Sequence, residues 1–390
     1  MTSSYHLEDR NKNIPKLRFK GYNDKWKHYR LKEIVKIYDG THQTPNYIND
    51  GIKFVSVENI SNLEGTNKYI SKDDYDKDFK IKPEINDVLM TRIGDIGTPA
   101  IIDTNENYAY YVSLALLKSN QEILFPKFFI QRILSESFQH ELWKRTLHVA
   151  FPKKINKNEI GECNVFICSK SEQEKIASFL TLLDKKIEKQ KELVELLKKY
   201  KRGLLSSIFS QNLRFKDNDG SDYPTWEEKR LEEILKIKHG KSQKEIECTN
   251  GKYPILATGG EIGRTNSCLW NKPCVLIGRK GTIDKPQYME TPFWTVDTLF
   301  YSEVFKDNNA KYLYYLFNTI NWKKYDESTG VPSLSAKTIE RIKVTLSISN
   351  TEQTIISKIL SKFDNKIQQE ECILSNLQTY KKGLLQQMFI

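Results

Sequence analysis

Two short polar segments, each directly after a glycine, combine hydroxyl, amide, imidazole and ammonium groups. They are Thr41, His42, Gln43 and Thr44 after Gly40, and Lys241, Ser242, Gln243 and Lys244 after Gly240. Side chains of these types can read base edges in the major groove of DNA through hydrogen bonds. An ordinary polar turn at a protein surface would use the same residue types. The segments are therefore candidate nucleic-acid contacts, with a plain turn as the alternative.

Basic side chains, which mostly position phosphate groups, recur at further places. Arg92 and Arg279 follow similar apolar segments, and a phosphate-binding or structural role is favoured for them because one shared residue cannot distinguish two sequences. Arg264 ends the glycine-rich segment 258–264, which could approach a ligand closely or simply turn a hairpin. The remaining candidates, with a solvated face as the alternative, are Lys144, Arg145, His148, Lys153 and Lys154, and in the second half Lys280, Lys323, Lys324, Thr329 and Gly330.

No motif for catalysis or metal binding accompanies these residues. The sequence has no GxGxxG, no (D/N/S)PP(Y/F) motif of an adenine methyltransferase and no zinc-ligand spacing among its histidines and cysteines. Gly240-Lys241-Ser242 resembles the end of a phosphate-binding loop, but Leu235 stands where that loop needs glycine. The segment 227–229, Glu-Glu-Lys, could belong to a nuclease, although a solvated turn is the better interpretation. We therefore expect no catalytic site, no bound cofactor and no metal.

The composition fits a globular protein that binds a polyanion. The 390 residues carry a formal net charge of +11, and 38% are hydrophobic. This balance favours a nucleic-acid partner, although an AT-rich genome would also enrich lysine. The absence of a long apolar run predicts no membrane span, and the polar start, 1–13, predicts a loose tail rather than a signal peptide. Six scattered cysteines predict free thiols in a reducing cytoplasm.

One long segment occurs twice. Residues 171–209 and 351–389 align without a gap, and in both the apolar residues follow the 4-3 spacing of a coiled coil. Each segment therefore predicts one helix, about 58 Å long, which would exceed the roughly 35 Å between half-sites on one face of DNA. We expect the two seams to pair with each other, because that buries both within one molecule. Polar residues interrupt both seams at matching places, namely Gln190 and Glu370, and Lys201 and Lys381.

Shorter blocks repeat in front of these helices. Trp26 and Gly40 match Trp226 and Gly240, and a Val-Leu segment precedes both Arg92 and Arg279, while the stretches between the blocks share little. Mixed patterns predict an α+β fold. The expected strands are 54–57, 87–93, 99–102, 110–117, 253–258, 273–278 and 298–304, and the expected helices are 126–145 and 309–325. The predicted layout is a tail (1–13), a domain (14–168), a helix (169–210), a second domain (211–348) and a second helix (349–390).

This layout resembles the specificity subunit of type I restriction–modification systems. The resemblance covers nearly the whole chain after about residue 14 and rests mainly on the repeated helix, with Glu-Gln near its start and Lys-Arg-Gly-Leu-Leu or Lys-Lys-Gly-Leu-Leu near its end. It implies two α+β target-recognition domains that each read one half of a split, asymmetric DNA sequence. It also implies that the two helices pair as an antiparallel coiled coil with pseudo-two-fold symmetry.

The resemblance also implies partners. They are double-stranded DNA, two adenine methyltransferase subunits and translocating restriction subunits, and S-adenosylmethionine, ATP and Mg would belong to those subunits. Because a surface that occurs twice can receive two copies of one subunit, we expect methyltransferase subunits to dock on the two repeated helix surfaces and at the recognition domains. The two helix surfaces are Tyr200, Lys201, Arg202 and Gly203, and Tyr380, Lys381, Lys382 and Gly383. The alternatives are a scaffold that organises partners without reading DNA, and an intrinsic nuclease.

Overall fold

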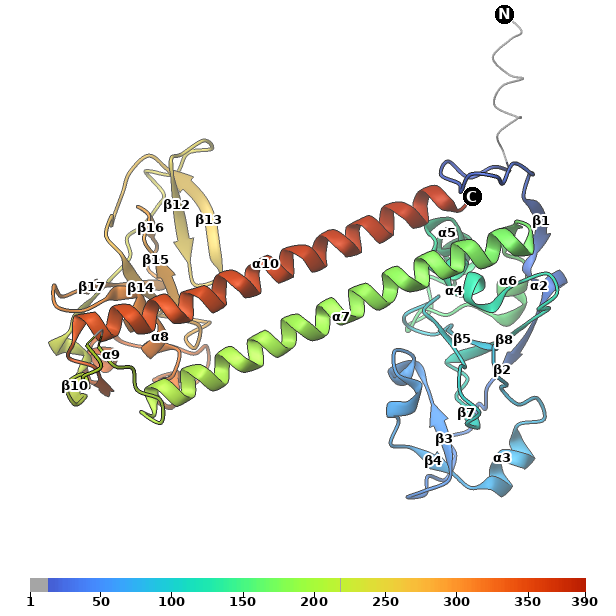
Figure 1. The fold of residues 1–390 in the computed structure, drawn as a ribbon, viewed down its shortest axis with the longest axis horizontal. Helices are drawn as coiled ribbons and strands as arrows, with labels where there is room; N and C mark the ends of the chain where they lie inside the picture. Colours follow the sequence, from blue (N-terminus) through green and yellow to red (C-terminus); the bar gives the residue numbers. More distant parts are fainter. Residues whose placement is uncertain (1–12, 218) are drawn as a thin grey trace, which may run out of the picture. The chain divides into compact units, whose positions relative to one another are not determined.

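The computed structural model describes residues 13–217 and 219–390 and divides into two compact units. Unit 1 comprises residues 1–191 and 373–390, and unit 2 comprises residues 192–372. The long helices α7 (Lys170–Phe209) and α10 (Asn350–Met388) each contribute to both units (Figure 1). The expected N-terminal tail lies outside the described residues, apart from its last residue. Among the residues that are described, no helix is long and apolar enough to cross a membrane.

In the described residues, the globular domain of unit 1 contains three sheets, five short α-helices and two 3-10 turns. Its strands are β1 (Lys27–Arg30), β2 (Val35–Asp39), β3 (Ile52–Val55), β4 (Tyr69–Ile70), β5 (Val88–Thr91), β6 (Pro99–Ile101), β7 (Tyr108–Tyr110), β8 (Leu114–Ser119) and β9 (Asn164–Ile167). Its helices are α2 (Leu31–Ile34), α3 (Lys72–Asp78), α4 (Pro126–Leu134), α5 (Glu136–Arg145) and α6 (Lys157–Gly161). The central sheet has the order β2-β8-β5-β6, and β4-β3-β7 and β1-β9 form the other two.

The central sheet of unit 1 separates two apolar clusters. Side chains alternate between the faces of a strand, so Val88 and Met90 of β5 pack with the helices, whereas Leu89 packs with the β4-β3-β7 sheet. Both faces are therefore covered, and β5 is fully buried. A short strand that is apolar throughout is typical of a sheet buried on both sides. This is why the sequence pattern located β5 well.

The globular domain of unit 2 repeats this architecture. Its strands are β10 (Glu227–Arg230), β11 (Leu235–Lys238), β12 (Tyr253–Ala257), β13 (Gly260–Thr265), β14 (Cys274–Gly278), β15 (Gln287–Met289), β16 (Trp294–Thr295), β17 (Leu299–Val304) and β18 (Lys343–Leu346). Its helices are α8 (Ala310–Phe317) and α9 (Ala336–Arg341). The sheet orders are β11-β17-β14-β15, β13-β12-β16 and β10-β18, which correspond one to one to the sheets of unit 1.

In both domains, the turn after the central strand (β5 or β14) is bonded through its backbone to the loop that precedes the last short helix (α6 or α9). Gly94 donates to Lys153 in unit 1, and Gly281 donates to Pro332 in unit 2. Both glycines have a left-handed conformation, with φ of 82° and 84°. Glycine adopts this region without steric cost. The repeated glycine of the sequence is therefore a repeated turn.

The Glu-Gln pair near the start of each long helix fixes the helix to its domain. Glu172 is fully buried and accepts two hydrogen bonds of 2.7 Å from Arg18. Glu352, also fully buried, accepts from Arg214 at 3.0 Å and from Trp226 at 2.9 Å. The adjacent glutamines, Gln173 and Gln353, bond to backbone groups of the domain that precedes each helix. The diagnostic sequence motif thus has a structural cause, because a buried carboxylate needs its partner.

The two long helices pair in antiparallel orientation, as predicted. In unit 1 the end of α10 packs against the beginning of α7, and Lys381 forms an ion pair with Asp184 at 2.5 Å. In unit 2 the end of α7 packs against the beginning of α10, and Lys201 forms an ion pair with Asp364. Each polar interruption at these lysines is thus neutralised by an aspartate of the other helix. The same contact occurs in each unit with the roles of the two helices exchanged.

Two predicted helices are shorter than expected. The predicted helix 126–145 is broken at Ser135, whose hydroxyl donates to the carbonyl of Arg132. Serine competes in this way with the backbone bonds of a helix. The predicted helix 309–325 ends at Phe317, whose carbonyl accepts the indole N–H of Trp322. A separate 3-10 turn then covers Trp322–Tyr325.

One predicted strand and one predicted turn also change. The predicted strand 110–117 is two strands, β7 and β8, because Leu114 bonds back to Tyr111 in a tight turn. The segment 227–229, interpreted as a solvated turn, forms strand β10, which pairs antiparallel with β18. Charged side chains there gave no strand signal. The pairing depends on a strand more than 100 residues away, which local sequence cannot reveal.

Candidate DNA interface and partner surface

The polar segments after Gly40 and Gly240 are loops held at equivalent places. A Cβ atom at Gly40 would overlap the carbonyl oxygen of Tyr110, and one at Gly240 would overlap that of Val296. The next residues, Thr41 and Lys241, donate their backbone N–H groups to carbonyl groups of the adjoining sheet. The loop backbones are thus anchored, whereas most of their side chains are exposed. The exposed ones are His42, Gln43, Thr44, Lys241, Ser242 and Lys244, and Thr41 and Gln243 are half-buried.

The two aligned arginines differ in their environment. Arg92 is buried, donates to the carbonyl of Val112 and forms a 2.8 Å ion pair with Asp39. The guanidinium of Arg92 is engaged within the fold and is not free to meet a phosphate group. Of the two roles considered for Arg92, the structural one therefore applies, and we no longer treat it as a DNA-binding candidate. Arg279 is only half-buried and forms an ion pair with Asp297. It stays a candidate, together with the exposed neighbour Lys280.

The basic segment of unit 1 separates into structural and exposed residues. Glu141 pairs with Arg145 at 2.9 Å and with Lys144 at 3.2 Å, and it accepts two hydrogen bonds from Asn164. Burial alone would raise the pKa of Glu141, but the bonds from Asn164 and Lys144 and the charge of Arg145 lower this pKa to about 2. Arg145 is therefore committed to the fold. Lys144, with half of its side chain exposed, can still reach a partner.

The remaining candidates of unit 1 lie on one loop. His148 bonds to the carbonyl of Trp143, and Lys153 follows an exposed tip that contains Phe151. A recess of about 410 Å³ lies between this loop and α5, lined in part by His148, Lys153 and Gly94. The structure therefore brings the loop together with the turn after β5, although these segments are about 60 residues apart.

The corresponding loop of unit 2 is polar, and hydrogen bonds to Asp326 hold its two ends together. The carboxylate of Asp326 accepts the backbone N–H groups of Ser328 and Ser333, and these bonds lower its pKa. Thr329 and Gly330 are exposed at the tip. The bridge between Ser333 and Lys280 places Lys280 beside this loop. Lys323 and Lys324 are exposed as well, and Lys323 lies 3.3 Å from Asp284.

Arg264 lies in a hairpin, as the structural alternative proposed. It belongs to β13, which pairs with β12, and its side chain donates to the carbonyls of Gly251 and Lys252. It also forms an ion pair with Glu261. These bonds close the hairpin and leave its side chain less than half exposed. We conclude that Arg264 stabilises this loop.

The repeated helix surface is exposed in both copies. Tyr200 is 61% and Tyr380 is 57% exposed, and a Cβ atom at Gly203 or Gly383 would meet no neighbour. Arg202 and Lys382 are exposed beside them. By contrast, Lys201 and Lys381 form ion pairs within the chain, so they belong to the helix pairing rather than to the free surface.

The surface around Tyr200 is hollowed into an apolar groove of about 590 Å³ in unit 2. Its walls include Leu196, Leu204 and Leu213 beside Tyr200 and Gly203. The sequence reasoning did not identify Leu196 or Leu213. The available signal was that Leu196 falls outside the 4-3 spacing of its helix. In the structure both leucines are exposed, and exposed leucines next to a repeated Tyr and Gly suit a surface that another chain covers.

The family model for the type I restriction modification DNA specificity domain matches residues 23–198 and 223–379. A type I specificity subunit of Mycoplasma genitalium is 26% identical over 251 residues, which are 61% of this chain and 64% of that protein. The match thus spans slightly less than two thirds of that relative.

Solved structures show the same fold. The S subunit of a type I restriction–modification system from M. genitalium superposes with a TM-score of 0.67 at 21% identity, covering 96% of this chain and 99% of that one. A structure from work on complex assembly and conformational transition of the type I system gives 0.57 at 13% identity, covering 93% and 97%. Since the family model matches both halves of the chain, the protein belongs to the family of type I restriction–modification DNA specificity subunits.

Proposed function

We propose that this chain is a DNA-recognition subunit whose two domains each read one half of a split, asymmetric sequence. The observation that carries the proposal is the pair of loops after Gly40 and Gly240. Their backbones are anchored in the same way, yet their side chains differ at most positions. A shared anchor with different hydrogen-bonding groups is what two different half-sites require. The exposed Lys144 and Lys153, and Lys280 and Lys324, would position each domain through phosphate groups.

We also propose that two adenine methyltransferase subunits dock on the repeated surfaces around Tyr200 and Tyr380. The exposed tyrosines and the open glycines support this assignment, because large amphipathic side chains beside a flat backbone suit a protein interface. Translocating restriction subunits would join this complex. S-adenosylmethionine, ATP and Mg would be bound by the partners, in the bacterial cytoplasm, and this chain would direct their activity without catalysing a step.

Long-read methylation sequencing of host DNA tests the proposal, with the gene for this chain intact and deleted and the methyltransferase gene untouched. We expect adenine methylation at one split, asymmetric motif that disappears on deletion. Unchanged methylation, in cells shown to express both proteins, would favour the scaffold alternative. Cleavage of DNA by the isolated chain in the presence of Mg²⁺ would instead revive the nuclease alternative.

A further inference from the structure

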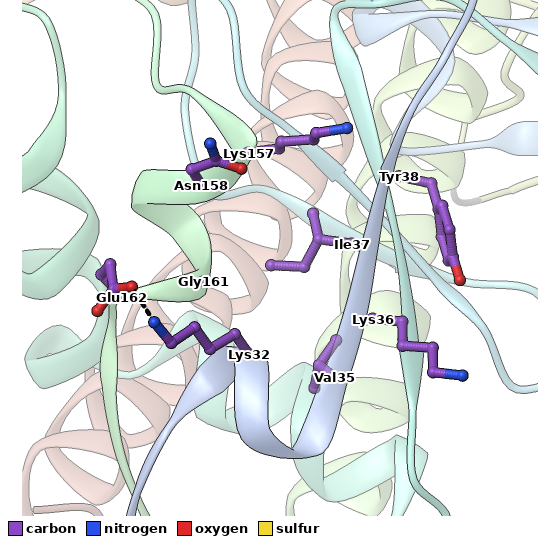
Figure 2. A pocket seen from close by; sticks show the side chains of 9 residues that line it. All are labelled: Lys32, Val35, Lys36, Ile37, Tyr38, Lys157, Asn158, Gly161 and Glu162. Atoms are coloured by element: carbon purple, nitrogen blue, oxygen red, sulfur yellow. Dashed lines mark hydrogen bonds and ion pairs between the residues drawn. The ribbon is translucent and has the colours of Figure 1, made fainter.

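A recess of about 560 Å³ in the first domain lies between α6 and the edge strand β2. Figure 2 shows Ile37 projecting from β2 toward α6, whereas Lys36 and Tyr38 project from the other side of the strand. Lys32 points to Glu162, with which it forms an ion pair. The other lining residues are Val35, Lys157, Asn158 and Gly161.

The second domain has a buried carboxylate at the corresponding place. The helices α6 and α9 align through Ile160 and Ile339, which are both fully buried. This alignment puts Glu340 where the first domain has Gly161. The Glu340 carboxylate accepts the N–H of Ile237 at 2.9 Å and a bond from Lys236 at 3.3 Å. The repeat therefore shows which chemical group fits this place.

The N–H of Ile37 is oriented to receive the same group. Backbone bonds in an antiparallel pair alternate along the strand. Asn120 donates to the carbonyl of Ile34, just as Phe305 donates to that of Ile234 in the second domain. The N–H of Ile37 therefore faces away from β8, toward the recess. Within the described part of the chain, no carboxylate occupies the position at Ile37 that Glu340 occupies at Ile237.

Gly161 keeps the recess open without a backbone reason for glycine. Its φ is not in the left-handed region, and a Cβ atom would lie 3.2 Å from the Cβ of Lys32. Three lysines line the recess, but Lys32 pairs with Glu162 and Lys157 lies 3.7 Å from Asp39, so among the described residues Lys36 is the lysine that forms no ion pair. An edge N–H together with this one lysine suits a single carboxylate, as Ile237 and Lys236 do for Glu340 in the second domain.

We propose that this recess binds the carboxylate of an aspartate or glutamate side chain of a partner protein. That carboxylate would accept the Ile37 N–H and pair with Lys36, as Glu340 does with Ile237 and Lys236. Because Glu162 and Asp39 engage Lys32 and Lys157, the recess offers an incoming anion the Ile37 N–H and Lys36 alone. These two groups suit one carboxylate, whereas a row of duplex phosphates would also meet Glu162 and Asp39. The identity of the partner, the methyltransferase subunit, rests on the proposed function.

Lysine acetylation followed by mass spectrometry tests which partner fills the recess. The full chain is labelled alone, with the methyltransferase subunit, with the target duplex, and with free glutarate. We expect the subunit to slow acetylation of Lys36 about tenfold, and duplex or glutarate alone to leave it unchanged. Lys236, which already pairs with Glu340, is the matched control and should react equally with and without the subunit. Protection of Lys36 by duplex or by glutarate alone would overturn the assignment.

A second arm uses the repeat itself. Gly161→Glu supplies an internal carboxylate, and we expect about tenfold weaker binding of the methyltransferase subunit, with the same change in melting temperature as Gly161→Ala because both add a Cβ atom 3.2 Å from that of Lys32. Gly161→Ala, which adds no carboxylate, should bind like the wild type. Wild-type affinity of folded Gly161→Glu would contradict the proposal, and if that variant fails to fold, the protection of Lys36 decides. If wild-type chain neither binds the subunit nor directs methylation, the proposed function fails too, whereas normal methylation with an unprotected Lys36 removes only this site.

Discussion

The two globular domains share their internal bonds and differ in what they expose. Both anchor a long helix through a buried glutamate, and both turn after the central strand at a left-handed glycine. Their surface loops, in contrast, carry Thr-His-Gln-Thr in one domain and Lys-Ser-Gln-Lys in the other. The recess at Gly161 is open, whereas Glu340 fills its counterpart. Residues that hold the framework are thus duplicated, as are the exposed tyrosines of the long helices, whereas the polar loops and the recess are individual to each domain.

The largest loss of stability is expected when the buried glutamate that anchors a long helix is removed. Glu172→Ala would leave Arg18, whose side chain is only 11% exposed, without its carboxylate, and should destabilise unit 1 by about 3–5 kcal/mol. Glu352→Ala should cost about as much, because Arg214 is 28% exposed and keeps bonds to two backbone carbonyls, but the buried indole N–H of Trp226 also loses its acceptor. Chemical denaturation of each variant measures both values. The exposed Glu174→Ala is the control, and a loss no larger than in that control would contradict the role of the motif.

The anchoring glycines and the helical glycines should respond to alanine with opposite sign. Gly40→Ala and Gly240→Ala place a Cβ atom on a carbonyl oxygen, and each should destabilise its domain by about 1–3 kcal/mol. Gly203→Ala meets open space in a helix and should stabilise the chain by roughly 0.5–1 kcal/mol. Thermal unfolding distinguishes the two directions. Equal shifts at Gly40 and Gly203 would show that the loop anchor is not strained by a side chain.

Loop substitutions should affect one half of the DNA target at a time. A His42→Ala, Gln43→Ala double variant should lose about 1–3 kcal/mol of discrimination for each base contact removed in one half-site. Ser242→Ala with Lys244→Ala should do the same in the other half. Competition binding of the complex to duplexes mutated in either half measures the discrimination. If either double variant weakened both halves equally, the loops would serve phosphate positioning instead of base reading.

The smallest effect concerns acid stability. Because the pKa of Glu141 in the folded chain is lowered to about 2, its ionised form stabilises the fold above its unfolded pKa of about 4.5. This contribution is lost as pH falls from about 4.5 toward 2. Glu141→Gln should therefore flatten the loss of stability between pH 5 and pH 3.5 by roughly 1 kcal/mol. Denaturant titrations at several pH values measure the slope, and a slope equal to that of the wild type would refute the assignment.

Features with long regular patterns could be predicted from the sequence. The two long helices begin and end within two residues of the predicted bounds, because their 4-3 spacing persists over about ten turns and the two copies support each other. The buried strand β5 was found because it is apolar on both faces. Elements that depend on one side chain, such as the break at Ser135, or on a distant partner, such as β10, were missed or misassigned.

The candidate site was predictable in part. Residue type identified Arg92 and Arg145 as basic, but only packing shows that Asp39 and Glu141 neutralise them. The polar loops were found because their glycines align, which marks a shared backbone position with free side chains. The recess at Gly161 was not found from the sequence. It is recognised only when α6 is aligned with α9, which carries Glu340 at the same place, and this alignment follows from the fold rather than from sequence similarity.

Exchanging one domain tests the central claim most directly. Residues 14–165 are replaced by the corresponding segment of another family member with a known target, and the methylated motif is determined by long-read sequencing. If each domain reads its own half-site, one half of the motif changes to that of the donor, while the half read by the second domain stays the same. A motif that changes in both halves, or in neither, would contradict independent reading by two domains.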